Sequence, residues 1–283
     1  MFKFMKSSML VSIILILSLL LGACGAGTNS NSQTTPPAQS QAEAQGNETP
    51  AETVELTVSA AASLTDALKE IQTLYEASHK NIKLVYNFGA SGALQKQIEQ
   101  GAPADLFFSA SSKNMKALVE GELIHADKQR NLLSNELVVV MPSDGAAGIG
   151  NEQDLKKDDV KIVAIGIPES VPAGNYAKEA LTNVQLWDEL QPKMVQAKDV
   201  RQVLQYVETG NADAGFVYKT DALTTSKVKI AFTVDQSAYT PVKYPVGIVE
   251  ATKHAGEAEE FYNFLGTKEA LDVFLKYGFT IPK

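Results

Sequence analysis

Short apolar runs alternate along this chain with longer segments in which apolar residues recur every three or four positions. The short runs are typical of buried strands, and the spaced pattern is typical of amphipathic helices. From Val54 onward, the alternation predicts α/β layers with largely parallel sheets. The expected strands are 56–58, 82–86, 105–110, 137–140, 161–167, 193–197, 214–218 and 244–249. The expected helices are 63–79, one through Leu94 and Ile98, one through 116–120, then 174–183, 200–209, 261–265 and 271–276.

The same order of elements is used twice, which predicts two α/β lobes. Ligands of open α/β sheets bind beyond the carboxyl ends of the strands, so two lobes would face each other across a cleft that closes like a hinge. Strands 137–140 and 244–249 are expected to carry the chain between the lobes. We therefore expect lobe 1 in residues 54–136 and 244–283, and lobe 2 in residues 137–243.

The N-terminus has the pattern of a secretory signal. Lys3 and Lys6 precede an apolar run from Met9 to Leu21, which is too short to span a bilayer comfortably. The run ends in Leu21-Gly22-Ala23-Cys24, which resembles the lipobox of bacterial lipoproteins. In that family the cysteine becomes the acylated N-terminus after cleavage. We expect a signal peptide in residues 1–23 and a lipid anchor that holds the protein on the extracytoplasmic face of the cell membrane; the alternative is a plain signal peptide with an incidental cysteine.

The segment behind this signal has the composition of a linker. Residues 24–53 contain no aromatic residue, Lys or Arg and cannot bury a core, so we expect a flexible tether behind Cys24. Cys24 is the only cysteine, which excludes an intramolecular disulfide and disfavours a Cys-ligated metal site. Without residues 1–23, 23 basic face 33 acidic side chains, a net charge of −10. Such a chain is a poor candidate for binding nucleic acid, and a bound anion would have to be held by local geometry.

Four of the expected strands end in turns of small, mostly neutral residues that lead straight into helices. The turns are Ala61-Ala62-Ser63, Ala90-Ser91-Gly92, Val171-Pro172-Ala173-Gly174 and Lys198-Asp199-Val200. A helix start offers unpaired backbone N–H groups and the positive end of a dipole, which together attract anions. Four such turns predict a pocket, built from helix ends, around something small and negative.

Some of these residues also have an ordinary structural explanation. Ser63 with Asp66 fits a capping box, and taken alone a helix cap is the better interpretation of this serine. Ser91 is equally well explained as a turn serine. Tyr218 at a strand end could supply a phenolic donor, although half-buried core tyrosines are commoner in such places.

The other two turns favour bare backbone donors. Pro172 suits the first helical turn, and it leaves the amides of Ala173 and Gly174 with little side chain over them. Asp199 is expected to be a helix cap. Its charge would be awkward beside an anion, so either Arg201 offsets it or Asp199 turns away to cap its own helix.

Several segments resemble the molybdate-binding proteins of ABC importers, in order from about residue 55 to the end. They are Ala60–Thr65, Gly101–Phe107, Glu136–Val140, Val171–Leu181, Asp199–Arg201, Phe216–Tyr218 and Tyr277–Ile281. The resemblance implies a two-lobed type II periplasmic-binding-protein fold that holds molybdate or tungstate with no cofactor and no direct protein ligand to the metal. It also implies delivery to a separate membrane permease and ATPase, and a monomer. Family ligand positions carry over onto Ser63, Ser91, Ala173, Val200 and Tyr218.

The sequence around Ser91 departs from the family pattern. Family members often have a serine-rich run there, whereas this chain has Phe88-Gly89-Ala90-Ser91-Gly92-Ala93. Neutral donors suit molybdate, tungstate and sulfate, which carry no proton at neutral pH. A pocket without a carboxylate acceptor would disfavour protonated phosphate, whose O–H would lack a partner.

Two other functions remain open on the sequence. A binding protein for another anion, such as sulfate or thiosulfate, would share nearly all of these features. A surface-anchored hydrolase using Ser63 or Ser91 would need a base, and the three histidines, His79, His125 and His254, fall outside the four turns. The chain has no G-x-S-x-G elbow and no P-loop, so we expect a receptor and not an enzyme.

Overall fold

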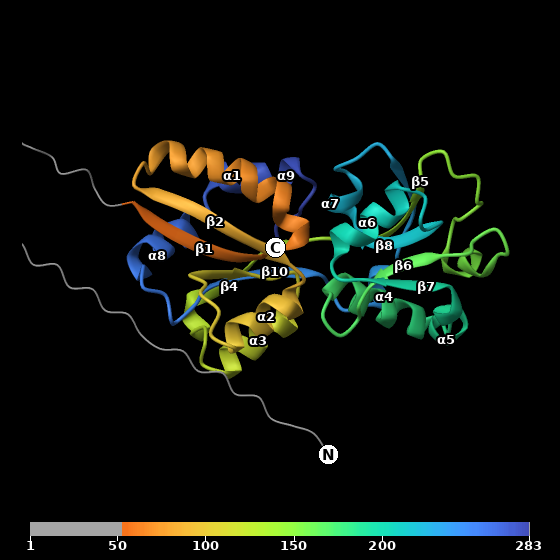
Figure 1. Cartoon of the computed structure of the whole chain (residues 1–283), viewed down its shortest axis with the longest axis horizontal. Coiled ribbons are helices and arrows are strands. Elements are labelled where there is room, and N and C mark those ends of the chain that lie inside the picture. The colour runs from red at the N-terminus through yellow and green to blue at the C-terminus, as the bar shows by residue number, and fades with distance from the viewer. Residues whose placement is uncertain (1–52, 283) are drawn as a thin grey trace, which may run out of the picture. The chain divides into compact units, whose positions relative to one another are not determined.

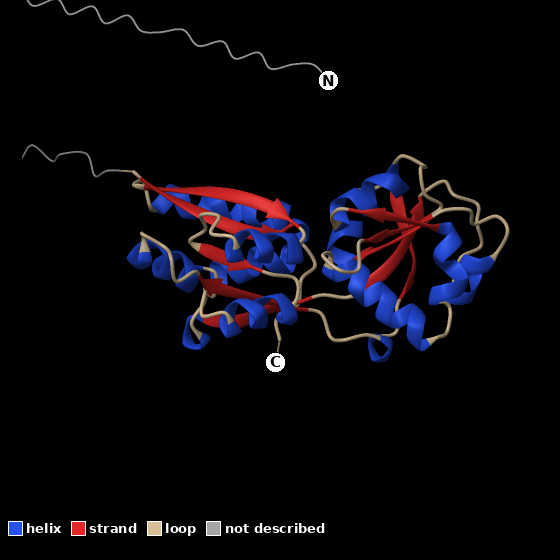
Figure 2. Cartoon of the chain, turned by 60° about the horizontal axis from the view of Figure 1, so that its bottom comes forward, coloured by secondary structure: helices blue, strands red, loops and turns tan. Residues whose placement is uncertain are grey.

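The computed structural model describes residues 53–282. The expected signal peptide, Cys24 and the tether up to residue 52 lie outside the described residues. Strands in the described part form two five-stranded sheets with helices packed against both, as Figure 1 and Figure 2 show. Within residues 53–282, no helix has both the length and the apolar character needed to cross a bilayer.

The first sheet has the strand order β2-β1-β3-β10-β4. Its strands are β1 (Val54–Ala61), β2 (Ile82–Gly89), β3 (Leu106–Phe108), β4 (Gln129–Ser134) and β10 (Lys243–Ile248). Its helices are α1 (Thr65–Ser78), α2 (Ser91–Glu99), α3 (Ser112–Glu120), α8 (Ala255–Phe264) and α9 (Lys268–Lys276). α1 lies beside α9, and α2 lies beside α3 (Figure 1). The apolar stripe that predicted α1 is its buried face, with Leu68, Ile71 and Tyr75 fully buried.

The second sheet has the order β7-β6-β8-β5-β9. Its strands are β5 (Leu137–Pro142), β6 (Val163–Gly166), β7 (Met194–Ala197), β8 (Ala214–Tyr218) and β9 (Val228–Thr233). Its helices are α4 (Pro172–Asn183), α5 (Trp187–Leu190), α6 (Val200–Glu208) and α7 (Lys219–Ala222). The expected apolar face of α6 is buried, and this helix packs on β8 and β6.

Both sheets are mixed, so the expectation of largely parallel sheets was wrong for two of the four strand pairings in each sheet. β1 pairs in parallel with β2 and β3, and β6 pairs in parallel with β7 and β8. β10 and β5 run antiparallel to both of their neighbours. These are the strands next to the two crossings: the chain passes from the first sheet to the second between β4 and β5 and returns between β9 and β10.

The parallel strands of each sheet place helix starts at their carboxyl ends. β1 leads through a 3₁₀ turn, Ala62–Leu64, into α1, and β2 leads into α2. In the second sheet, β6 leads toward α4 and β7 toward α6. These are the four strand-to-helix connections that the sequence predicted, and they supply most of the candidate site.

Candidate anion-binding site

The five site residues predicted from the sequence line one small cavity. Its lining residues are Ala61, Ala62, Ser63, Gly89, Ala90, Ser91, Ala110, Val171, Pro172, Ala173, Val200 and Tyr218. The empty space inside is about 210 Å³. None of the lining residues carries a charged side chain, so any attraction for an anion comes from hydroxyl groups and backbone N–H groups.

Ser63 lies in the 3₁₀ turn that precedes α1, and its side chain is buried. Its Oγ lies 2.9 Å from Oη of Tyr244 in β10. The helix-cap interpretation of Ser63 was wrong: the cap residue of α1 is Leu64, and no side chain caps this helix. Asp66, the other half of the expected capping box, instead contacts Arg201 at 2.6 Å. Asp66 therefore forms a tertiary ion pair with Arg201 in place of the expected local capping bond.

Ser91 is the first residue of α2 and is fully buried. Its Oγ accepts a hydrogen bond of 2.9 Å from the N–H of Ala110, which leaves the hydroxyl hydrogen available to the cavity. The next amide, Gly92 N–H, donates to the carbonyl of Ser170 at 3.0 Å. A Cβ at Gly92 would lie 2.7 Å from that carbonyl oxygen, so only glycine permits this close contact.

Ala173 and Val200 offer backbone N–H groups at the starts of α4 and α6. Both lie in the first turn, where no intrahelical acceptor exists, and neither donates to another backbone group among residues 53–282. Pro172 occupies the first turn of α4, as predicted. A Cβ at Gly174 would lie 2.0 Å from the carbonyl oxygen of Gly166, so glycine allows α4 to begin directly against the end of β6. This close packing fixes the position of the Ala173 amide.

Asp199 caps its own helix, as one of the two sequence alternatives expected. Its carboxylate accepts the N–H of Gln202 at 2.9 Å, and Asp199 is not among the cavity-lining residues. The negative charge is therefore engaged at the helix start and does not line the candidate site.

Tyr218 ends β8 and is almost completely buried. Its Oη has no hydrogen-bond partner among the described residues. Burial raises the pKa of this phenol well above its usual value, because a phenolate would be poorly solvated there. Tyr218 is therefore a neutral donor whose hydrogen has no competing acceptor in the described part of the chain.

The arginine in the first turn of α6 is held by two carboxylates. Arg201 Nη2 lies 2.6 Å from Asp66 Oδ2, and its Nε lies 2.7 Å from Asp221 Oδ1. The second contact is a close ion pair without linear hydrogen-bond geometry. Burial raises the pKa of Asp221 to about 6, although Arg201 opposes the rise. Asp221 also accepts the N–H of Tyr218 at 3.2 Å, which links this cluster to the cavity.

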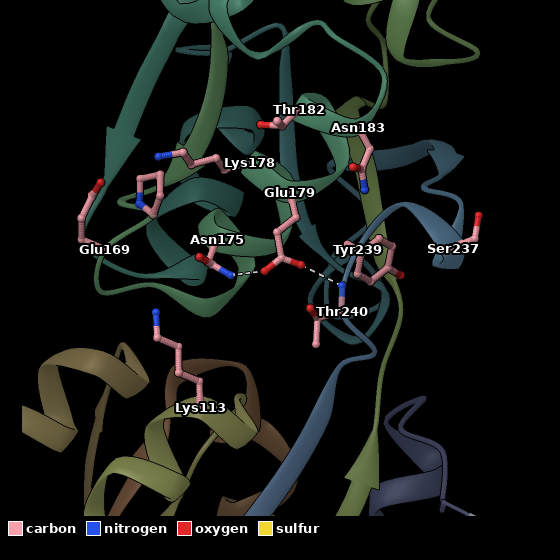
Figure 3. Close-up of a pocket in the computed structure, with 11 residues that line it drawn as sticks. Lys113, Glu169, Asn175, Lys178, Glu179, Thr182, Asn183, Ser237, Tyr239 and Thr240 are labelled. Carbon is pink, nitrogen blue, oxygen red and sulfur yellow. Dashed lines mark hydrogen bonds between the residues drawn. The ribbon is translucent and has the colours of Figure 1, made fainter.

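A wider groove nearby has a different character (Figure 3). Its empty space is about 1020 Å³, and its lining includes Lys113, Glu169, Lys178 and Glu179. The Glu179 carboxylate accepts from the side chain of Asn175 and from the N–H of Thr240 (Figure 3). Carboxylate acceptors repel a dianion, so this groove suits such a ligand less well than the neutral cavity.

In the described part, neither a histidine base at the cavity nor a metal-binding cluster is found. His79 and His125 contact Glu260 and Glu250 at the surface, and no histidine lines the cavity. Residues 53–282 contain no group of three or more His, Cys, Asp or Glu side chains that could hold a metal ion.

Two residues behind the cavity were not predicted from the sequence. Tyr244 contacts Ser63, and Asn135 contacts Tyr244 in turn. The sequence indicated only a buried strand at Tyr244 and carried no signal for the hydroxyl contact, because Ser63 and Tyr244 are 181 positions apart.

Residues 56–280 match the family of bacterial extracellular solute-binding proteins. The chain belongs to this family. YvgL of Bacillus subtilis (strain 168), provisionally named an ABC transporter substrate-binding lipoprotein, is 52% identical over 227 residues, 80% of this chain and 86% of that protein. The molybdate-binding protein ModA of Escherichia coli (strain K12) is 41% identical over 233 residues, 80% of this chain and 89% of ModA.

The fold has the same relatives. The structure of the periplasmic molybdate-binding protein of Azotobacter vinelandii superposes with a TM-score of 0.73 at 24% identity, covering 81% of this chain and all of that one. The resemblance to molybdate-binding proteins and the two-lobed α/β periplasmic-binding-protein fold are thus confirmed. This solute-binding protein is not an enzyme, so the serine hydrolase interpretation was wrong.

Proposed function

We propose that this solute-binding protein captures molybdate, and also tungstate, through neutral hydrogen-bond donors and delivers the anion to the permease of an ABC importer. The observation that carries the proposal is the uncharged cavity that the five predicted site residues line. Hydroxyl groups come from Ser63, Ser91 and Tyr218, and backbone N–H groups come from Ala173 and Val200. The molybdate-binding name of the Escherichia coli relative supports the choice of ligand.

The chemistry of the cavity suits an unprotonated tetrahedral dianion. Such a ligand needs donors only, and hydrogen bonds to a charged group contribute about 1.5–3 kcal/mol each. Two helix starts add favourable dipoles at the places where the ligand oxygens would lie. No lining side chain is a carboxylate, so the O–H of a protonated phosphate would find no strong acceptor. Selection between molybdate and the smaller sulfate then depends on the size of the closed cavity.

The N-terminal segment completes the proposal. Cleavage after residue 23 would leave Cys24 as a lipid anchor, and residues 25–53 would tether the binding lobes to the extracytoplasmic face of the membrane. The lipoprotein name of the Bacillus subtilis relative supports this placement. The permease and ATPase would be separate chains, and the receptor would act as a monomer. The proposed lobes are residues 54–136 with 244–283, and residues 137–243.

Titration calorimetry with molybdate, tungstate, sulfate and phosphate tests the proposal directly. We expect saturable binding of molybdate and tungstate, with much weaker binding of phosphate. Tighter binding of sulfate than of molybdate would favour the alternative that the protein serves another anion. Absence of binding heat with both molybdate and tungstate, repeated by a thermal-shift measurement, would reject the assignment.

A further inference from the structure

A chain of hydrogen bonds runs from the crossing between the sheets to the candidate site. Asn135 lies between β4 and β5, where the chain leaves the first sheet, and its Nδ2 lies 3.2 Å from Oη of Tyr244. Oη of Tyr244 lies 2.9 Å from Oγ of Ser63, which lines the cavity. All three side chains are at least nine-tenths buried, so water does not compete freely for these bonds.

The backbone fixes the direction of the first bond. The N–H of Glu136 donates to the side-chain oxygen of Asn135 at 2.9 Å. A backbone N–H can only donate, so this end of the Asn135 amide must be its oxygen and the other end its NH₂ group. The two NH₂ hydrogens then serve Oγ1 of Thr220 at 2.8 Å and Oη of Tyr244 at 3.2 Å.

The direction of the bond from Asn135 determines which group donates in the next contact, the one between Tyr244 and Ser63. Because Oη of Tyr244 accepts from Asn135, its own hydrogen is free to donate, and Ser63 Oγ is the acceptor beside it. Burial raises the pKa of Tyr244 well above its usual value, so the phenol keeps this hydrogen. Ser63 Oγ therefore accepts from Tyr244, and the Ser63 hydroxyl must direct its own hydrogen elsewhere. The open side of this hydroxyl is the cavity.

The other two hydroxyl groups of the cavity can also donate a hydrogen. Ser91 Oγ accepts from the N–H of Ala110, and Oη of Tyr218 has no acceptor among residues 53–282. Each of the three hydroxyl groups therefore has a hydrogen to present to a ligand.

We propose that Asn135 and Tyr244 are positioning residues that hold Ser63 as a hydrogen-bond donor, so that Ser63 favours an unprotonated oxygen of the ligand over an O–H group. The inference rests on the proposed function and deepens it, because it assigns the discrimination against hydrogen phosphate to two residues outside the cavity. An oxyanion with an O–H group needs an acceptor in the site, and the bond from Tyr244, the last step of this relay from Asn135 through Tyr244 to Ser63, occupies one of the two lone pairs with which Ser63 could accept.

Asn135→Asp reverses the relay with little change in shape. A carboxylate at this position accepts from Tyr244, so Tyr244 accepts from Ser63 and the Ser63 hydrogen turns away from the ligand. We expect the ratio of molybdate affinity to hydrogen phosphate affinity to fall by about 10- to 100-fold, the effect of one hydrogen bond to a charged group. Calorimetry and competition at mildly alkaline pH measure this ratio. Both ligands are dianions there, so repulsion by the new carboxylate largely cancels.

A double-mutant cycle separates the relay from a structural effect. Tyr244→Phe cuts the relay and frees Ser63 to accept, so we expect a lower ratio with molybdate affinity reduced less than about tenfold. Asn135→Asp added to Tyr244→Phe should change the ratio no further. Thr220→Val is the matched control: it removes the other acceptor of Asn135, leaves the relay intact and should preserve the ratio.

The outcomes separate this inference from the proposed function. A wild-type protein that does not bind molybdate rejects the proposed function. Normal molybdate binding, with the same affinity ratio in Tyr244→Phe as in the wild type, rejects the relay alone. An equal effect of Asn135→Asp with and without the Tyr244 hydroxyl also rejects it. If Asn135→Asp does not fold, the ratio measured for Tyr244→Phe decides.

Discussion

The small cavity and the wider groove near it differ in burial, in the charge of their lining residues and in size. The cavity is buried, has no charged lining residue and presents hydroxyl and backbone donors. The groove is lined by side chains of both signs, including Lys178 and Glu179, and is far larger. A buried charge needs a partner, whereas an exposed one is solvated, and the cavity is lined by uncharged residues alone.

The charged side chains next to the cavity make their contacts outside it. Arg201 and Asp199 flank the Val200 amide in sequence, yet each is satisfied elsewhere, Arg201 by Asp66 and Asp221 and Asp199 by its own helix. An unpaired arginine in the cavity would attract anions of any shape or protonation state. Oriented donors without acceptors attract only anions that can accept at every contact.

Placing a charge in the cavity should have the largest effect. Ser91→Asp keeps an acceptor for the N–H of Ala110 but sets a carboxylate against a dianion, and the repulsion is about 4 kcal/mol or more at protein-like dielectric. We expect molybdate affinity, measured by calorimetry, to fall about a thousandfold or more. The matched control is Thr182→Asp in the exposed groove, where we expect less than about a threefold change because the charge is solvated. Equal losses in the two variants would contradict the contrast between the two regions.

Removing the cation behind the cavity should mainly affect stability. Arg201→Met leaves the fully buried Asp221 without its ion pair, so we expect the free energy of unfolding to fall by about 3–5 kcal/mol at neutral pH. The loss should shrink as the pH falls towards about 6, because Arg201 opposes the rise in the pKa of Asp221 to about 6, so without Arg201 this carboxyl becomes neutral at a higher pH than in the wild type.

Urea unfolding across this pH range measures the effect. Asp66→Asn, which alters the more exposed partner of Arg201, is the control and should cost less than about 1 kcal/mol. A destabilisation of Arg201→Met that does not vary with pH would show that the lost packing of Arg201, and not the unpaired carboxylate, is responsible.

The helix starts could be predicted because they follow local rules. Pro172 in a first turn, Asp199 as a cap and small residues at four strand ends are properties of a few consecutive residues, and the structure has them where the sequence placed them. Strands β4 and β9 were missed. Both are edge strands with several polar or exposed positions, as in Gln129-Arg130-Asn131, so their apolar pattern is weak.

The hydroxyl network could not be predicted for a different reason. Ser63 and Asp66 carry the signature of a local cap, but both side chains have stronger tertiary partners in Tyr244 and Arg201. A short stretch of sequence shows the possible local cap, but it does not show the tertiary partner that lies far away along the chain. The mixed pairing of both sheets was missed on the same grounds, because the antiparallel strands are set by the two crossings between the sheets.

Removing one donor should give a smaller loss than adding a charge. Ser63→Ala should weaken molybdate binding by about 10- to 100-fold, since one hydrogen bond to a charged ligand is lost. Unfolding free energy should fall by about 1 kcal/mol, because the buried Tyr244 hydroxyl loses its acceptor. Thr65→Val, which removes the nearby bond from Thr65 to the Ala62 carbonyl, is the control and should leave affinity within about threefold. Calorimetry and chemical unfolding give the two quantities, and unchanged affinity of Ser63→Ala would remove Ser63 from the site.

Tyr218→Phe should separate binding from stability most clearly, although its effect on binding is the smallest. The Tyr218 hydroxyl is buried without a partner among residues 53–282, so it costs free energy until a ligand accepts its hydrogen. We expect the free energy of unfolding of the ligand-free variant to rise by up to about 1 kcal/mol while molybdate affinity falls about tenfold. Tyr239→Phe is the control, because the Tyr239 hydroxyl already accepts the N–H of Leu137 and its removal should lower stability without improving or impairing the cavity. A Tyr218→Phe protein that loses both stability and affinity would show that the phenol is an ordinary core group, and the cavity would then lack one of its three hydroxyl donors.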